Sequence, residues 1–166
     1  MNNIEQFTNE LNRINRQDIL NFCKSAISQL PNTFLQIASS TEVETVQYNM
    51  QTTIGIATEL FHCTTIYNFT ELEQDIIIAA LLLHNIYKHD KIHSEYIITK
   101  NAVEIVNSLR TLNHDLHPEI FECICDCITQ YSTTNNETSQ STEMQKFVNL
   151  CDYLANNTRI EFHLNQ

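Results

Sequence analysis

The sequence is poor in glycine, proline and basic residues. It contains one Gly and two Pro among its 166 residues, and it has no Trp. Barrels, sandwiches, Rossmann turns and phosphate-binding loops need glycine where the backbone adopts positive φ or approaches a phosphate closely, so these architectures are disfavoured. Nine Lys and Arg stand against 20 Asp and Glu, a net charge of −11 that opposes binding to a nucleic-acid duplex. A small anionic ligand would therefore need a local cation.

Long apolar segments are also missing. The longest uninterrupted apolar run, Ile76–Leu83, has eight residues, far fewer than the roughly 20 that a membrane span needs. The chain opens with the polar stretch MNNIEQFTNE and shows no basic and apolar leader. We expect a cytoplasmic, intracellular protein with no membrane partner, placed in a host cell if its origin is viral.

The six cysteines are expected to be reduced thiols. Cys123, Cys125 and Cys127 alternate along the chain and do not form a C-x-x-C pair. On a helix the middle one points away from its neighbours. We interpret them as small buried residues of a core helix rather than as zinc ligands.

Apolar residues recur at helical spacing along most of the chain. The expected helical segments are residues 4–30 (one or two helices), 42–61, 70–88, 94–112, 118–131 and 142–157. No linker or repeat divides them, so we expect one domain over 1–166, with N-terminal helices in 1–30 and a core in 31–161. The predicted fold is an all-α bundle of six or seven helices. Gly55, inside the second segment, is expected to allow close helix packing.

Two helix starts carry capping patterns. Thr70 with Glu73, and Thr142 with Gln145, match the capping box, in which a hydroxyl and a side chain three residues later satisfy free amides reciprocally. The first pattern begins the helix that contains Ile76–Leu83, which we predict to be central and buried on all sides.

Polar residues that interrupt apolar helix faces are the candidates for function, because burying them costs free energy unless a partner or a metal satisfies them. His84 directly follows three leucines, and Asp152 lies between Cys151 and the apolar Leu154. Taken alone, each has an ordinary explanation: a hydrogen-bonded histidine at the edge of the core, and a surface charge on a helix.

The surroundings of these two residues resemble a known family. The segment Asp75–Lys88 resembles the central motif of the HD superfamily of metal-dependent phosphohydrolases, in which an apolar helix ends in a His-Asp pair followed shortly by a lysine. Here the pair is His84-Asn85 and the lysine is Lys88. The segment Met144–Ala155 resembles the helix that supplies the final aspartate, which falls on Asp152, particularly as seen in small HD proteins of phage type.

Upstream, the run from Val46 to Phe61 is similar to the helix that carries the first histidine of the family, and that position falls on Asn49. The resemblance extends from about Leu30 to Glu161. It implies an HD-like helical bundle with a metal pocket where Asn49, His84-Asn85 and Asp152 converge. An active enzyme would use a divalent cation there, Mn, Fe, Zn or Mg, whereas a degenerate site would need none.

The chain departs from the full motif at two of its four ligand positions, because Asn49 and Asn85 are amides. An amide oxygen is a neutral and weaker ligand than an imidazole or a carboxylate. Some family members have further histidines, and His93 stands where one could fall, so that His84, His93 and Asp152 could form a three-ligand site with an open position.

The resemblance also implies that Lys88 would meet a substrate phosphate; its ordinary role would be a cation at a helix C-terminus. Tyr131 could stack on a nucleotide base, although such tyrosines more often pack half-buried. We expect His89 to be solvated, and we expect His114, His117 and His163 to be loop or terminal residues without a role.

Three functions follow. The sequence favours an HD-type protein with a degenerate metal centre that binds a nucleotide-like phosphorylated ligand or a protein partner. The first alternative is an active metal-dependent phosphohydrolase acting on a nucleotide or another phosphoester. The second is a helical protein-interaction module without a ligand site, because fold does not fix function. The sequence does not decide the oligomeric state.

Overall fold

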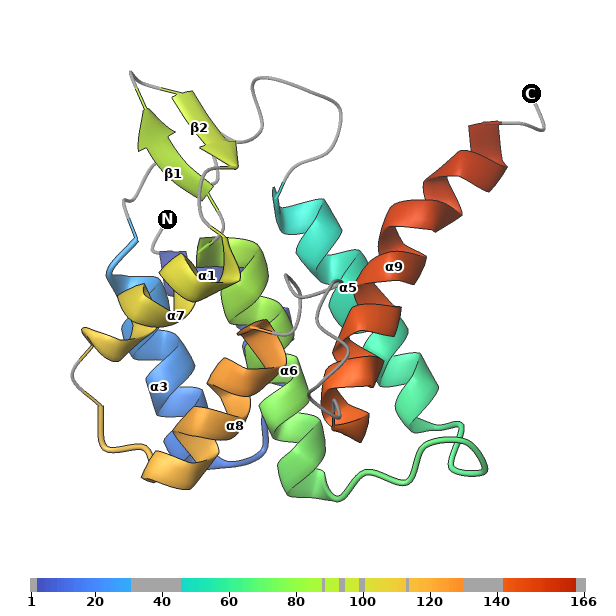
Figure 1. The fold of residues 1–166 in the computed structure, drawn as a ribbon, viewed down its shortest axis with the longest axis horizontal. Coiled ribbons are helices and arrows are strands. Elements are labelled where there is room, and N and C mark those ends of the chain that lie inside the picture. The colour runs from blue at the N-terminus through green and yellow to red at the C-terminus, as the bar shows by residue number, and fades with distance from the viewer. Residues whose placement is uncertain are drawn as a thin grey trace.

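The computed structural model shows helices arranged around one long central helix (Figure 1). It describes the backbone of residues 3–30, 46–87, 89–92, 95–98, 101–112, 114–129 and 142–163. Within these residues the elements are α1 (Asn3–Gln6), α2 (Thr8–Leu11), α3 (Gln17–Ser28), α5 (Val46–Phe61), α6 (Glu71–Tyr87), β1 (His89–Ile92), β2 (Glu95–Ile98), α7 (Ala102–Arg110), α8 (Pro118–Thr129) and α9 (Glu143–His163). The predicted all-α bundle is confirmed, since α1 and α2 are single turns and the two strands form no layer of their own.

Helix α6 is the centre of the fold. Its start is capped as predicted: the Thr70 N–H donates to Glu73 Oε2 at 2.8 Å, and the Glu73 N–H donates to Thr70 Oγ1 at 3.3 Å. The run Ile76–Leu83 is buried around the whole circumference of the helix. Helices α3 and α8 lie on one side of α6 and α5 and α9 on the other, and all four contact it (Figure 1). The prediction of a central, fully buried helix is therefore confirmed.

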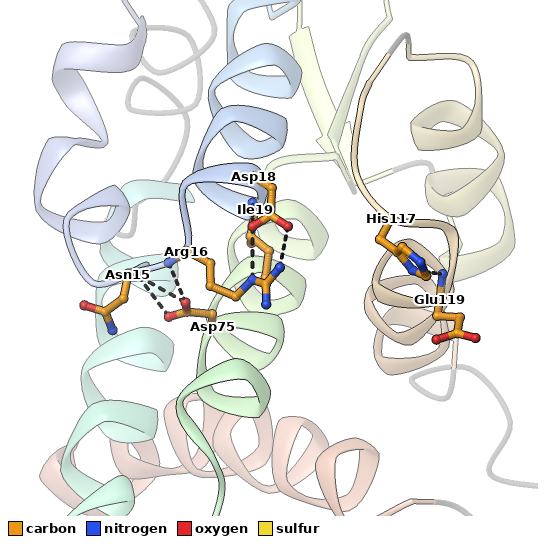
Figure 2. A network of polar contacts seen from close by, with 7 residues as sticks. All are labelled: Asn15, Arg16, Asp18, Ile19, Asp75, His117 and Glu119. Atoms are coloured by element: carbon orange, nitrogen blue, oxygen red, sulfur yellow. Dashed lines mark hydrogen bonds and ion pairs between the residues drawn. The ribbon is translucent and has the colours of Figure 1, made fainter.

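The N-terminal turn is tied to α6 by a buried carboxylate. Asp75 is 0 % exposed. It accepts hydrogen bonds from the Asn15 N–H at 3.0 and 3.1 Å and from the Arg16 N–H at 2.8 Å (Figure 2). Arg16 is the N-cap residue of α3 and offers no side-chain cap of its own. Asp75 thus satisfies amides at the start of α3 from a distant helix and places a negative charge where the helix dipole favours it.

The later helices begin at local caps. At α9, the Thr142 N–H donates to Gln145 Oε1 at 2.6 Å and the Gln145 N–H donates to Thr142 Oγ1 at 3.3 Å, as the sequence predicts. At α8, His117 Nδ1 accepts from the Glu119 N–H at 3.3 Å (Figure 2). Helix α9 runs to His163, beyond the predicted end at 157.

The predicted helix over 94–112 is wrong in its first part. Glu95–Ile98 is strand β2, which pairs antiparallel with β1 in the register His89 to Ile98, and α7 begins only at Ala102. Tyr96, Ile97 and Ile98 are aromatic and β-branched residues that favour a strand. Asn101 and Glu104 then form a capping box that starts a new helix.

An aromatic cluster packs α5 against α9. Phe61 and Phe147 stack with ring centroids 5.3 Å apart, and Tyr67 and Phe69 meet Phe147 edge-on at 4.7 and 5.0 Å. Such ring pairs add roughly 0.5–1.5 kcal/mol each beyond the free energy of burying their area.

Within the described residues, no helix is both long enough and apolar enough to span a membrane.

The expected close packing at Gly55 is wrong. Among the described residues outside its own helical turns, no heavy atom lies within 4 Å of a methyl group built on Gly55, so none of their elements needs a glycine here. Gly55 lies in the interior of α5, where it is less favourable than alanine because its backbone loses more freedom on folding.

We therefore expect Gly55→Ala to stabilise the protein by about 0.5–1 kcal/mol, since the methyl group has room and the helix propensity improves. Urea unfolding followed by circular dichroism measures this as a higher midpoint with an unchanged m-value. A lower midpoint would mean that a neighbour crowds the position.

We expect Asp75→Asn to lower the free energy of unfolding by at least about 2 kcal/mol, because the amide keeps the shape but loses hydrogen bonds to a charged acceptor and turns an N–H₂ toward backbone donors. Asp18→Asn is the matched control, because that carboxylate is only in part buried and pairs with Arg16. The control should lose much less stability. Equal losses in the two variants would contradict the role given to Asp75.

Candidate functional site

The last turn of α6 carries the His84-Asn85 pair. His84 is 8 % exposed and Asn85 is 1 % exposed, so both lie inside the bundle. Asn85 Nδ2 donates to the Leu81 carbonyl oxygen at 2.8 Å, one helical turn earlier. A carboxylate at position 85 could not make this bond, because an ionised carboxylate only accepts. Asn85 thus uses its side-chain amide as a donor to its own helix.

The three helices of the predicted site pack against one another. Helix α5 contacts α6 and α9, and α6 contacts α9. Asn49 belongs to the first turns of α5, the His84 pair to the last turn of α6, and Asp152 to the middle of α9. The start of α5 and the end of α6 lie toward the same end of the bundle (Figure 1). The convergence of the four side chains in one cavity stays a prediction.

Asp152 is half-buried on α9. Its Oδ2 accepts from Asn156 Nδ2 at 3.0 Å, a contact between residues four apart on one helix face. Asn156 is a neutral amide donor, so this contact brings no positive charge to the carboxylate.

Three further predicted site residues, Lys88, His93 and Tyr131, lie outside the described residues. Neither the three-ligand site of His84, His93 and Asp152 nor the phosphate role of Lys88 can therefore be placed. In the described part of the chain, no group of three or more His, Cys, Asp and Glu side chains is arranged to hold a metal ion.

The cysteines of α8 are packing residues. Cys125 and Cys127 are buried in the core as predicted, whereas Cys123 is only half-buried. Burial raises the pKa of Cys125 and Cys127 to about 12, and it does the same for Cys23 and Cys151. An unfolded chain releases these protons near pH 9.0, so the buried thiols stabilise the fold below that pH, and this contribution is lost between pH 9.0 and about 12.

We expect a chromogenic aromatic disulfide to react fast with one thiol, Cys63, which is exposed, and more slowly with Cys123. The other four thiols should react only when the fold opens. Cys63→Ser should remove the fast phase alone. Fast labelling of Cys125 or Cys127, located by mass spectrometry, would contradict their burial.

No protein-family model, no curated protein and no solved structure matches the chain. The resemblance to the HD superfamily therefore rests on the sequence around His84 and Asp152. The family, its metal and its chemistry stay predictions.

Proposed function

We propose that the chain is an HD-superfamily phosphohydrolase-like protein whose metal centre is degenerate, and that it binds a nucleotide-like phosphorylated ligand where α5, α6 and α9 meet. The observation that carries the proposal is the bond from Asn85 Nδ2 to the Leu81 carbonyl in a buried turn. This contact supports the proposal because it requires an amide at the position where the family's mechanism requires a carboxylate.

In this proposal, Lys88 supplies the local cation that a ligand phosphate needs. The chain carries a net charge of −11, so an anion needs a local cation, and Lys88 follows the last turn of α6 in the sequence. Asp152 on α9 would then accept from donor groups of the ligand, such as the hydroxyls or the exocyclic amine of a nucleoside. A protein partner at the same surface is the other occupant that the degenerate centre allows.

The alternative is an active metal-dependent phosphohydrolase. A divalent ion would lower the pKa of a bound water and polarise a phosphoryl oxygen, with His84 and Asp152 as its ligands and Lys88 on the phosphate. Two amides in place of charged or imidazole ligands oppose this alternative. Loss of even an outer-shell group costs roughly 10- to 100-fold in metal affinity or activity, and these are ligand positions.

We expect the purified chain to hold less than one equivalent of Mn, Fe or Zn and to release no phosphate from a panel of nucleotides. The same panel in a thermal-shift assay should reveal a ligand, because binding to the folded state raises the midpoint. Restoring the motif with Asn85→Asp and Asn49→His should raise Mn²⁺ affinity at least about 100-fold. The restored protein should also be less stable without metal, because its new buried carboxylate cannot donate to Leu81.

The matched control is Asn107→Asp with Asn12→His, which makes the same changes at exposed positions on α7 and after α2. It should leave Mn²⁺ affinity unchanged. Tightly held metal in the natural chain, with phosphate release that disappears in Asp152→Ala, would replace the proposal with the active enzyme. No gain of Mn²⁺ affinity in the restored protein would mean that the two positions do not share a site.

A further inference from the structure

A cavity lies on the α3 side of α6, away from the α5 and α9 junction. It has a volume of about 310 Å³ and lies between α3 and the loop that precedes α8. Asp18, Asn21 and Phe22 line it from α3, and His114, Asp115 and Leu116 line it from the loop. This volume is at the small end of the range for ligand pockets, roughly 300–1,000 Å³, and fits a ligand smaller than a drug.

The His114 ring is held in place by two phenylalanines. It stacks on Phe121 with ring centroids 4.5 Å apart and meets Phe22 edge-on at 4.9 Å. Phe22 and Phe121 also contact each other edge-on at 5.6 Å, so rings from α3, α8 and the loop form one unit. The orientation of the imidazole is therefore fixed before any ligand arrives.

The burial of one ring nitrogen of His114 indicates where its proton lies. Nδ1 is closed off from solvent and has no hydrogen-bond partner among the described residues. A proton on Nδ1 would be a buried donor without an acceptor, which folded proteins rarely contain. We therefore assign the ring proton to Nε2. Because His114 lines the cavity, we take Nε2–H as the donor that it has for a ligand there.

The charged groups of the cavity are acidic. The Arg16 guanidinium donates to both oxygens of Asp18, at 3.1 and 2.7 Å, and holds the pKa of that carboxyl below its ordinary value (Figure 2). Asp115 is exposed and makes no hydrogen bond or ion pair with the described residues. No lysine or arginine is among the lining residues. Among its described lining residues, the cavity therefore has one carboxylate without an ion-pair partner, Asp115, together with the apolar side chains of Phe22 and Leu116.

We propose that this cavity binds a small organic amine. The ammonium group pairs with Asp115, the apolar body rests on Phe22 and Leu116, and an oxygen of the ligand accepts the proton of His114 Nε2. Asp115 disfavours an anionic ligand, since no lysine or arginine is among the described lining residues. The site is separate from the α5, α6 and α9 junction, so it does not depend on the function proposed there.

Tyramine is a suitable probe, because it joins a primary ammonium group to a phenol of matching size. Titration of the ¹⁵N-labelled full chain should move the amide signals of Asn21, His114 and Asp115 first. The neutral analogue 4-ethylphenol should bind at least about fivefold more weakly, and Asp115→Asn should weaken tyramine about fivefold. His114→Phe keeps a flat ring, removes the donor, and should weaken tyramine by roughly fivefold as well.

Glu59→Gln is the control, because it removes the same unit of charge from an exposed carboxylate on α5, which contributes none of the described lining residues. It should leave tyramine affinity unchanged. Thermal midpoints establish that each variant is folded before it is titrated. The proposal is overturned if about 10 mM tyramine moves none of the three signals, if 4-ethylphenol binds equally well, or if Asp115→Asn and Glu59→Gln behave alike.

Discussion

The fold depends on one buried carboxylate. Asp75 lies sixty positions from Asn15 in the sequence, yet its oxygens take up the free amides at the entry to α3. A buried charge without such partners would cost several kcal/mol, so the N-terminal turn and the central helix have to be assembled together. The same charge has a local effect: it adds to desolvation in raising the pKa of the Cys23 thiol on α3. The central helix is thus both the apolar core and the anchor of the N-terminal segment.

The sequence was informative wherever the deciding interaction is local. The boxes at Thr70 and Thr142 placed the starts of α6 and α9, because their partners lie three residues away. The apolar run of α6 likewise predicted its burial, because the whole signal lies within one continuous segment. From the sequence, Asp75 was interpreted only as part of a helical motif. Its role in satisfying amides could not be predicted, because those amides belong to another segment. The hairpin was missed because helix-like spacing around 94–101 outweighed the β-branched residues of β2.

The residues of the candidate site also differ in how far the sequence could reveal them. Sequence reasoning identified His84 as a polar group at the end of a buried helix, and the structure places it and Asn85 inside the bundle. The sequence did not show what the Asn85 side chain contacts. The structure shows that it donates to the Leu81 carbonyl oxygen. His114 could not have been selected from the sequence. The orientation of its ring depends on Phe22 and Phe121, which come from α3 and α8. From the sequence, a histidine in a loop is expected to face water.

A second contact completes the attachment of α3 to α6. At the far end of α6, the Tyr87 hydroxyl donates to the Ala26 carbonyl oxygen at 2.9 Å, in a buried position. With Asp75 at the other end, α3 is fastened at both of its termini, and a slide of one helix along the other would break both attachments at once. Shear between these two helices would therefore cost both sets of hydrogen bonds. The wall that α3 contributes to the His114 cavity is rigid and preformed, so a molecule that enters spends none of its binding free energy on ordering it.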